Sequence, residues 1–485
     1  MLAKEIYEKY EVVVGLEVHA QLLTNSKAYS SDSAAYGAMP NTHVSAVSLG
    51  HPGTLPKFNQ KTLEYGIRLG LAIGAQIRRE NQFARKNYFY ADLPKGYQIT
   101  QDKTPLCNGG SIQIKSKKGI KDVGITRIHM EEDSGKSIHD LDPYHSLIDL
   151  NRAGVPLLEI VSEPDIRSAQ EAYDYLLEVR KLVRYLEICD GNMEEGSLRC
   201  DANVSVRLKG SKNFGERTET KNLNSIRNVF RAIEFEAKRQ IAIVEKGGEI
   251  KMETMGFDAV KGTTHVQRSK EMAHDYRYFP EPDLSAIFVE NEQIQEVEKN
   301  LPPLPNQLKK KYIDNLKLSE YDAEILTEDK YIALYYEQLI EFTDNYKAAA
   351  NWMMGAVKSY LNENAMHIRD FPVLPKHLAE LIGMIDQKEI SNSIANQKIF
   401  PVMVRESRSS PKAIAQENNW LQESDENELA TYIDRALEKF PEKVKAYQAG
   451  NKNLLGLFMG EVMKASKGKA DPKRTKTLIE EKLIL

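Results

Sequence analysis

Every second residue from Val12 to Leu22 is apolar, and this pattern constrains the fold more than any other feature of the chain. Successive side chains of a strand point to opposite faces of a sheet, so the pattern predicts a strand with one face in the core. The other face carries Glu17, His19 and Gln21, which places a carboxylate and an imidazole about 7 Å apart along the strand. Both side chains are able to reach one cation, although the solvent face of an edge strand explains the same pattern.

The residues from Ser197 to Leu208 alternate in the same way. Cys200 belongs to the apolar set, so we expect it in the core as a structural thiol rather than as a nucleophile. Arg199, Asp201 and Asn203 lie on the other face and combine donors with acceptors. They are typical of the wall of a site for an anionic polar ligand, and also of a plain exposed face.

Two further segments add carboxylates. Glu131 and Glu132 stand in an acidic run, and Glu159 is the single charged residue of an apolar stretch. A buried carboxylate is costly unless it is paired or binds a cation, so the alternative for Glu159 is an ion pair with an arginine such as Arg152. Four carboxylates gathered around His19, with Glu17 as the fourth, require divalent cations among them. Such oxygen-rich ligands suit Mg²⁺ or Mn²⁺ better than structural zinc.

The distribution of glycine divides the chain. Residues 1–302 hold 22 of the 28 glycines, and the change coincides with a proline cluster at 302–305, which predicts a boundary near 295–305. The first part combines strands with a few helices, one beginning at Ser168 with a capping box to Glu171 and another spanning about Ser225 to Lys246. The rest is helical, with a second break near Ser407. We therefore expect an α+β protein: a mixed or antiparallel sheet domain, an all-α domain and a small helical tail.

Composition excludes several classes of protein. Three cysteines are too few for a disulfide framework, no apolar run approaches the length of a membrane span, and the first residues do not form a secretion signal. We therefore expect a protein of the reducing cytoplasm. The formal net charge is −4, but residues 443–476 contain nine Lys and Arg against two acids, a basic segment suited to contacting phosphates.

Several catalytic motifs are missing. The triplet at 135–137 resembles the end of a P-loop, but Met130 stands where that motif requires glycine. The chain also has no metalloprotease, α/β-hydrolase or protein-kinase signature, and no amidase signature, so we do not expect it to hydrolyse glutamine. The run from Arg85 to Gln98 interleaves bases with aromatics. Such a run suits phosphates and stacked bases, and equally a solvated strand edge.

Six motifs, taken in order, resemble the B subunit of the tRNA-dependent amidotransferase GatCAB, over nearly the whole chain. They are Gly15–Leu22, Arg85–Gln101, His129–Lys136, Asp149–Asp165, Asp190–Arg207 and His274–Asp283. That heterotrimer converts glutamyl-tRNA(Gln) to glutaminyl-tRNA(Gln), or aspartyl-tRNA(Asn) to asparaginyl-tRNA(Asn), with ATP as co-substrate. The resemblance implies an ATP-dependent ligase whose A subunit supplies ammonia and whose small C subunit completes the complex.

The resemblance also implies domains and site residues. It predicts a cradle domain over residues 1–295, a helical domain over 296–407 and a YqeY-like tRNA-binding tail over 408–485. His19, Glu132 and Glu159 are expected to bind magnesium, with Glu17 and Glu131 serving the same or a second metal. Ammonia is expected to arrive near Lys86, Tyr88 and Lys95; the ATP or the acceptor end of the tRNA is expected near Arg152, Arg199, Asp201 and Asn203; and the tail is expected to bind tRNA through Lys467, Lys469, Lys473 and Arg474.

A non-catalytic function remains the alternative. In that interpretation the chain is a scaffold that positions misacylated tRNA for an enzyme elsewhere, and the acidic cluster holds a structural ion. Magnesium-dependent ATP hydrolysis stimulated by misacylated tRNA distinguishes the two.

Overall fold

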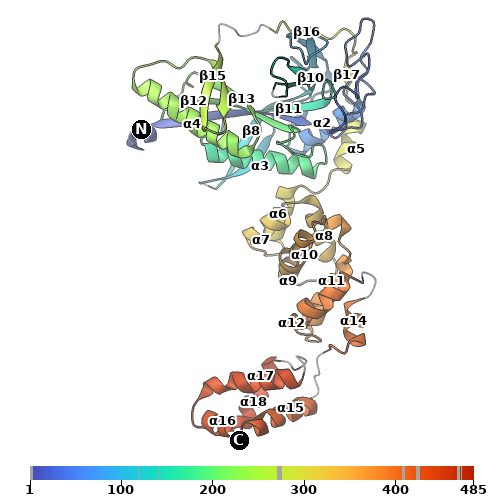
Figure 1. Ribbon diagram of the computed structural model, residues 1–485, viewed down its shortest axis with the longest axis vertical. Helices are drawn as coiled ribbons and strands as arrows, with labels where there is room; N and C mark the ends of the chain where they lie inside the picture. Colours follow the sequence, from blue (N-terminus) through green and yellow to red (C-terminus); the bar gives the residue numbers. More distant parts are fainter. Residues whose placement is uncertain are drawn as a thin grey trace. The chain divides into compact units, whose positions relative to one another are not determined.

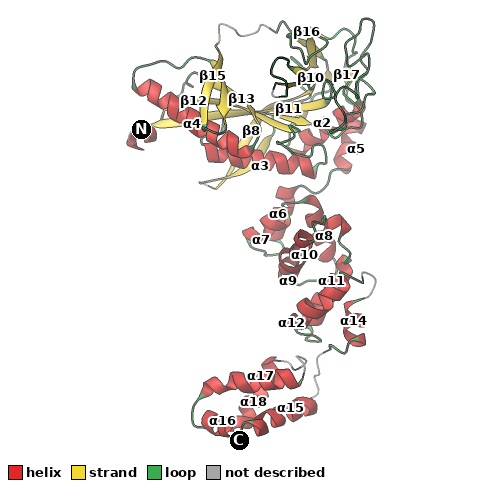
Figure 2. Ribbon diagram, in the orientation of Figure 1, coloured by secondary structure: helices red, strands yellow, loops and turns green. Residues whose placement is uncertain are grey.

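The computed structural model describes residues 4–117, 119–139, 141–269, 276–406, 410–421, 426–466, 470 and 472–484. It shows an α+β protein with an N-terminal sheet domain followed by helices, which confirms the expected fold class (Figure 2). The chain divides into two compact units, Met1–Leu304 and Pro305–Leu485. Each unit is considered by itself.

A ten-stranded sheet forms the centre of the first unit. Its strands follow the order β15-β14-β13-β12-β1-β11-β8-β6-β2, with β7 pairing beside β6 on β8. Three small sheets, β16-β4-β5, β9-β10 and β3-β17, complete the strands. The bounds are β1 (Tyr10–Gln21), β2 (Gln76–Ile77), β3 (Glu80–Asn81), β4 (Ala84–Asn87), β5 (Tyr97–Thr100), β6 (Cys107–Asn108), β7 (Ser111–Ser116), β8 (Gly119–Glu132), β9 (Lys136–Ile138), β10 (Leu147–Asp149), β11 (Pro156–Ser162), β12 (Leu198–Leu208), β13 (Thr218–Leu223), β14 (Glu253–Asp258), β15 (Thr263–Ser269), β16 (Phe279–Pro280) and β17 (Ile287–Phe288).

β1 lies in the interior of the sheet, between β11 and β12, and pairs with both in antiparallel register. The two strands that alternation predicted are therefore neighbours, and the interpretation of β1 as an edge strand is wrong. Val14, Leu16, Val18 and Ala20 are almost completely buried, which confirms the predicted core face. The odd-numbered side chains of β1 therefore lie on the opposite face of the sheet, beside the side chains of β11 and β12 with which they are paired.

Helices α2 (Gln60–Ala72), α3 (Ala169–Tyr185) and α4 (Ile226–Glu245) pack on the core face and contact β11, β1 and β12, respectively. Figure 1 shows α3 and α4 along one side of the sheet. α3 begins as predicted, because the Ser168 side chain accepts a hydrogen bond from the backbone N–H of Glu171. The expected reciprocal bond of a capping box is not formed: the Glu171 carboxylate accepts from the backbone N–H of Arg167 instead. α1 (Lys4–Glu8) and α5 (Asn291–Lys299) complete the helices described in this unit.

A buried carboxylate on α4 joins this helix to two strands. Glu236 is completely buried and accepts hydrogen bonds of 2.8 Å from the hydroxyls of Thr218 on β13 and Thr264 on β15. The Arg239 guanidinium donates two further hydrogen bonds to it, at 2.9 and 2.6 Å. Burial by itself raises the pKa of Glu236, but these donors outweigh it and hold the pKa below its usual range.

The second unit is helical throughout the residues described. Helices α15, α17 and α18 pack around a core of their own that includes Ile433, Phe458, Val462 and Ile479. None of the helices described in the chain combines the length and the hydropathy needed to span a membrane. The bounds are α6 (Pro305–Asp314), α7 (Glu320–Leu326), α8 (Lys330–Leu339), α9 (Tyr346–Trp352), a π-helix (Met353–Val357), α10 (Lys358–Glu363), a 3₁₀ turn (Ile368–Asp370), α11 (Pro375–Asp386), α12 (Asn392–Ile394), a π-helix (Ala395–Ile399), α13 (Phe400–Met403), α14 (Pro411–Glu417), α15 (Glu426–Lys439), α16 (Pro441–Gln448), a 3₁₀ turn (Lys452–Leu454), α17 (Leu455–Ala465) and α18 (Pro472–Ile484).

Candidate active site

The face of the sheet that α2, α3 and α4 leave uncovered carries a band of polar side chains across five adjacent strands. The register fixes which residues meet: His19 is the Cα partner of Glu159 on one side and of Arg199 on the other. The band consists of Arg127, His129 and Glu131 on β8, Glu159 on β11, Glu17 and His19 on β1, Arg199, Asp201 and Asn203 on β12, and Glu219 and Lys221 on β13.

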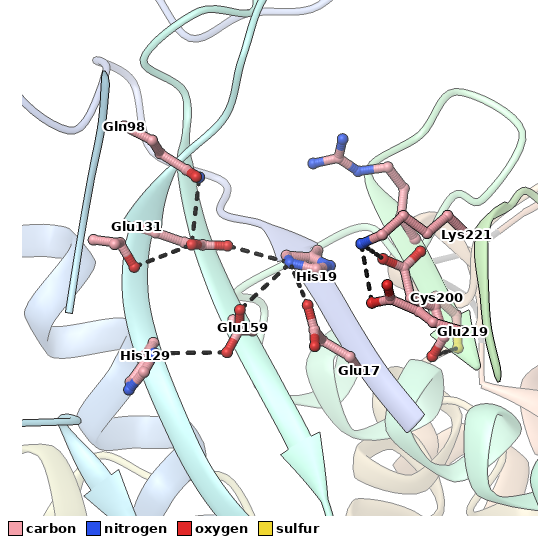
Figure 3. Close-up of polar contacts among 12 residues, drawn as sticks. Glu17, His19, Gln98, His129, Glu131, Glu159, Cys200, Glu219 and Lys221 are labelled. Atoms are coloured by element: carbon pink, nitrogen blue, oxygen red, sulfur yellow. Dashed lines mark hydrogen bonds and ion pairs between the residues drawn. The ribbon is translucent and has the colours of Figure 1, made fainter. Parts of the chain in front are cut away.

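His19 is the centre of an acidic cluster (Figure 3). Its Nε2 atom lies 3.3 Å from Glu131 Oε1, 3.6 Å from Glu17 Oε1 and 3.8 Å from Glu159 Oε2. Glu131 and Glu159 are buried, with exposed fractions of 2% and 7%. Three separate segments of sequence thus place three carboxylates around one imidazole.

The pKa values in this cluster reflect an excess of negative charge. Burial lowers the pKa of His19, but the hydrogen bond with Glu131 and the charges of the three carboxylates outweigh it and raise the pKa to about 9. Burial raises the pKa of Glu159, and the charges of Glu131 and Glu17 raise it further. For Glu131, burial is outweighed by the hydrogen bond and charge of His19, which hold the pKa below its usual range. One imidazolium therefore does not balance the three carboxylates.

The donor set fits a hard divalent cation. Ligand atoms of Glu17, His19 and Glu159 all lie within 4.8 Å of one another. Carboxylate oxygens dominate the set, and Mg²⁺ and Mn²⁺ prefer such ligands. Glu131 is positioned beside them by hydrogen bonds from Thr100 Oγ1 (3.1 Å) and Gln98 Nε2 (3.3 Å).

Glu132 is not brought into this cluster, although the resemblance implies a metal-binding role for it. Its carboxylate forms an ion pair with Lys95 and accepts a 2.9 Å hydrogen bond from the backbone N–H of Ile99. Adjacent residues of a strand face opposite ways, so Glu131 and Glu132 cannot both face His19 while β8 stays extended. Lys95 and Glu132 line a separate small pocket together with Lys27.

Lys86 and Tyr88 lie at the β8 side of the cluster. Lys86 Nζ is 5.0 Å from the centre of the Tyr276 ring, and Tyr88 packs edge-on against the same ring. Burial lowers the pKa of Lys86, but the negative charge of Glu131 and Glu159 outweighs it and raises the pKa. Lys86 therefore lies within electrostatic range of the cluster, whereas Lys95 is bound to Glu132.

The four residues predicted for the ATP or the acceptor end lie beside the cluster, toward β12. Arg199 forms an ion pair with Asp133 at 2.8 Å, and Asp201 forms one with Lys221 at 3.3 Å. Asn203 faces Gly15 across the β1–β12 pair. Arg152 lies in the loop before β11 and donates hydrogen bonds to the carbonyl oxygens of Ser134 (3.0 Å) and Gly135 (2.6 Å).

The suggested pairing of Glu159 with Arg152 is wrong. The arginine beside Glu159 is Arg127, whose Nη2 lies 3.4 Å from Glu159 Oε1. Arg152 Nε lies 3.6 Å from Asp133 instead. Arg127 lies on the same face as Glu131, because both are at odd positions of β8. The register of β8 against β11 then places Arg127 near Glu159.

Sequence reasoning missed several residues of this face, among them His129 and Lys221. His129 Nδ1 lies 3.5 Å from Glu159 Oε1, and burial together with the charge of Arg127 lowers the pKa of His129 to about 4. Lys221 Nζ lies 3.0 Å from Glu219 Oε1 as well as near Asp201. His129 is two residues from Glu131 on the same strand, so alternation could have predicted that it lies on the same face. A bulge between β12 and β13 shifts the pairing near Lys221, so alternation could not have shown which residues Lys221 lies beside.

The predicted tRNA contacts of the tail are described in part. Lys473 and Arg474 lie on α18 and are exposed. Lys467 and Lys469 lie outside the described residues.

Comparison with known proteins identifies the family. A family model described as the GatB/GatE catalytic domain matches residues 12–295, and one described as the GatB domain matches residues 334–483. The B subunit of the aspartyl/glutamyl-tRNA(Asn/Gln) amidotransferase of Persephonella marina is 47% identical over 98% of this chain and 100% of its own length. The chain belongs to the family of amidotransferase B subunits. The corresponding B subunit of Geotalea uraniireducens is 49% identical over 98% of this chain and 99% of its own.

Membership of the B-subunit family confirms the resemblance that the six motifs indicated. The family model described as a catalytic domain covers the whole acidic cluster and all of the sheet except the first two residues of β1. This chain therefore combines the polar sheet face with a helical extension that also matches a family model.

Proposed function

We propose that the chain is the cytoplasmic subunit that activates the side-chain carboxylate of misacylated glutamyl-tRNA(Gln), aspartyl-tRNA(Asn) or both, in an ATP-dependent ligase. The observation that carries this proposal is the cluster of Glu17, Glu131 and Glu159 around His19 within the domain that matches the catalytic model. A carboxylate does not react with ammonia, because attack would destroy its resonance and expel oxide. It must first be converted to a better electrophile.

The conversion is a phosphoryl transfer. A side-chain oxygen of the substrate attacks the γ-phosphorus of ATP, the bond from that phosphorus to the bridging oxygen breaks, and ADP leaves. Ammonia then attacks the acyl carbon, the carbon–oxygen bond to phosphate breaks, and the nitrogen loses a proton to give the amide. Such transfers depend chiefly on positioning and charge neutralisation.

The residues of the cluster act as ligands in this scheme rather than as general bases. Glu17, His19 and Glu159 hold the cation, and Glu131 either joins them or holds a second one. Bound Mg²⁺ supplies the positive charge that neutralises phosphate oxygens. Gln98 and Thr100 orient Glu131, and His129 and Arg127 stand beside Glu159. We assign Glu132 to the Lys95 pair rather than to the first cation.

Ammonia must come from a partner. Free ammonia is mostly protonated in neutral water and is then not a nucleophile, and the chain carries no amidase signature. A glutaminase A subunit, with a small C subunit, supplies it, and Lys86, Tyr88 and Lys95 belong to the region where it arrives. The segment 408–485, which follows the cradle (1–295) and the helical domain (296–407), binds tRNA phosphates through its basic residues.

Amidation driven by external ammonium tests the proposal, because it bypasses the glutaminase. In the assembled enzyme, His19→Ala should abolish ATP-dependent amidation and leave glutamine hydrolysis largely intact. The scaffold alternative predicts that ATP cleavage persists in this variant. Robust amidation by His19→Ala would overturn the assignment of the cluster.

A further inference from the structure

Arg199 occupies the position on β12 directly across from His19. The two residues are Cα partners in the antiparallel β1–β12 pair, so their side chains leave the sheet on the same face. Arg199 therefore places a positive charge beside the acidic cluster, on the β12 side of it. Asp201, two residues farther along β12, is the Cα partner of Glu17.

A buried carboxylate fixes the Arg199 guanidinium. Its Nη2 atom lies 2.8 Å from Asp133 Oδ2, and Asp133 is only 3% exposed. The same Oδ2 atom accepts a 2.7 Å hydrogen bond from Gln21 Nε2, and Oδ1 accepts one of 2.9 Å from the backbone N–H of Ser134. Asp133 is thus engaged through both oxygens, and it anchors the Nη2 end of the guanidinium.

The Nε donor of this guanidinium has no partner in the part of the protein that the structure describes. Arg199 Nε is buried and has no hydrogen-bond partner among the residues described. Buried polar groups are nearly always paired, so the acceptor for this N–H comes from a ligand or an ordered water. The guanidinium is itself charged, so the hydrogen bond is charge-assisted, and an anionic acceptor adds Coulomb attraction to it.

We propose that Arg199 binds the side-chain carboxylate of the amino acid on the misacylated tRNA and holds it for attack on ATP. This proposal rests on the proposed function. The carboxylates of Glu17, Glu131 and Glu159 repel a substrate carboxylate, so its approach requires a cation that they do not already neutralise. Arg199 meets this need because Asp133 Oδ2 lies 2.8 Å from Arg199 Nη2 and also 3.6 Å from Arg152 Nε, so one carboxylate faces two guanidinium groups.

The assignment also explains discrimination between substrate and product. The reaction replaces a carboxylate by a neutral amide, so the Coulomb attraction between Arg199 and the substrate's negative charge is lost when the product forms, although the amide oxygen still accepts a hydrogen bond. Arg199 would therefore favour the misacylated tRNA over the corrected one. A nucleotide phosphate at the same donor would give no such preference.

The test compares two aminoacyl-tRNAs that differ only in this group. With the assembled enzyme, we would measure the KM of glutamyl-tRNA(Gln) and the inhibition constant of glutaminyl-tRNA(Gln) for the wild type and for Arg199→Gln and Arg199→Lys. The expected result is an increase in KM of about 10- to 100-fold in Arg199→Gln, with a much smaller increase in the inhibition constant of the product. Arg199→Lys retains the charge but lacks Nε, so it should recover only part of the loss.

Arg207→Lys is the matched control. Arg207 lies on the same strand and has its own carboxylate partner, with Nη2 2.6 Å from Glu11 Oε2, but it is eight residues away from Arg199. This variant should leave both constants unchanged. An increase in the KM of ATP alone in Arg199→Gln would overturn the proposal in favour of a nucleotide contact, and so would an equal loss of affinity for both aminoacyl-tRNAs.

The experiments distinguish failure of the Arg199 proposal from failure of the proposed function. Amidation that survives His19→Ala contradicts the proposed function, whatever Arg199 does. Amidation abolished by His19→Ala together with unchanged constants in both Arg199 variants contradicts only the role of Arg199. If Arg199→Gln does not assemble, the KM of Arg199→Lys decides, because that change keeps the ion pair with Asp133.

Discussion

Glu131 and Glu132 are neighbours on β8, yet their carboxylates serve different partners: Glu131 lies 3.3 Å from His19, and Glu132 is paired with Lys95. The pleat of the strand separates them, because successive side chains leave a strand on opposite faces. A cation at His19 is therefore expected to depend on one of these two acids much more than on the other.

The neighbouring acids can be distinguished by their effect on magnesium dependence. Glu131→Gln should raise the Mg²⁺ concentration for half-maximal amidation by at least about 10-fold, since it changes a side chain in contact with His19. Glu132→Gln should leave this concentration almost unchanged, whatever it does to the maximal rate. The measurement is a Mg²⁺ titration of ATP-dependent amidation. Equal shifts in the two variants would place Glu132 among the cation ligands.

The buried carboxylate of Glu236 should make the stability of the first unit depend on pH. Its folded pKa is held below the usual value of 4.5, so its contribution to the free energy of unfolding is complete above about pH 4.5 and is lost as the pH falls through the folded pKa. Glu236→Gln should lower that free energy by about 3 kcal/mol near pH 7, because Arg239 loses its partner. Urea unfolding at pH 7 and at pH 4 measures both effects, and an unchanged pH dependence in the variant would contradict them.

The basic surface of α18 should contribute to tRNA affinity through phosphates. Reversing two charges, with Lys473→Glu and Arg474→Glu, should weaken binding most at low salt. It should also reduce the slope of log affinity against log salt by roughly 0.9 for each phosphate that the variant no longer neutralises. Filter binding across a salt titration measures this, with Lys209→Glu, an exposed lysine at the end of β12, as the control. A slope equal to that of the wild type would exclude α18 as a tRNA-binding element.

Gly135 should be intolerant of a side chain, although it is not part of a phosphate-binding loop. A Cβ atom there would lie 2.9 Å from the carbonyl oxygen of Asp92 and 3.0 Å from that of Asp149, and neither backbone atom can yield easily. We expect Gly135→Ala to cost about 1–3 kcal/mol of stability. Gly383→Ala, within α11 and with open space around it, should instead stabilise by about 0.5–1 kcal/mol. Thermal unfolding of the two variants, which should shift in opposite directions, tests this.

Alternation predicted the strands of the candidate site because it depends only on local geometry. The strand expected over Val12–Leu22 is β1 (Tyr10–Gln21), and the helix expected from Ser225 is α4, which begins at Ile226 with Ser225 as its N-cap. The partners of individual charges were not predictable, because they follow from pairing between distant segments. Arg127 rather than Arg152 stands beside Glu159 for this reason.

The same limit applies to the two neighbouring acids. The motif that contains Glu131 and Glu132 indicates that an acid is needed there, but only the register of β8 against β11 shows which one faces His19. The ion pair between Lys221 and Asp201 was not predictable, because a bulge in the pairing of β12 with β13 changes which residues of the two strands are neighbours.

The proposed cation ligands Glu17, His19 and Glu159 lie within β1 and β11, two paired strands, rather than on loops. Inserting or deleting one residue in the middle of β11 would turn Glu159 toward the apolar layer under the helices and bring a leucine or isoleucine to His19. The lengths of these strands are therefore a functional constraint in their own right.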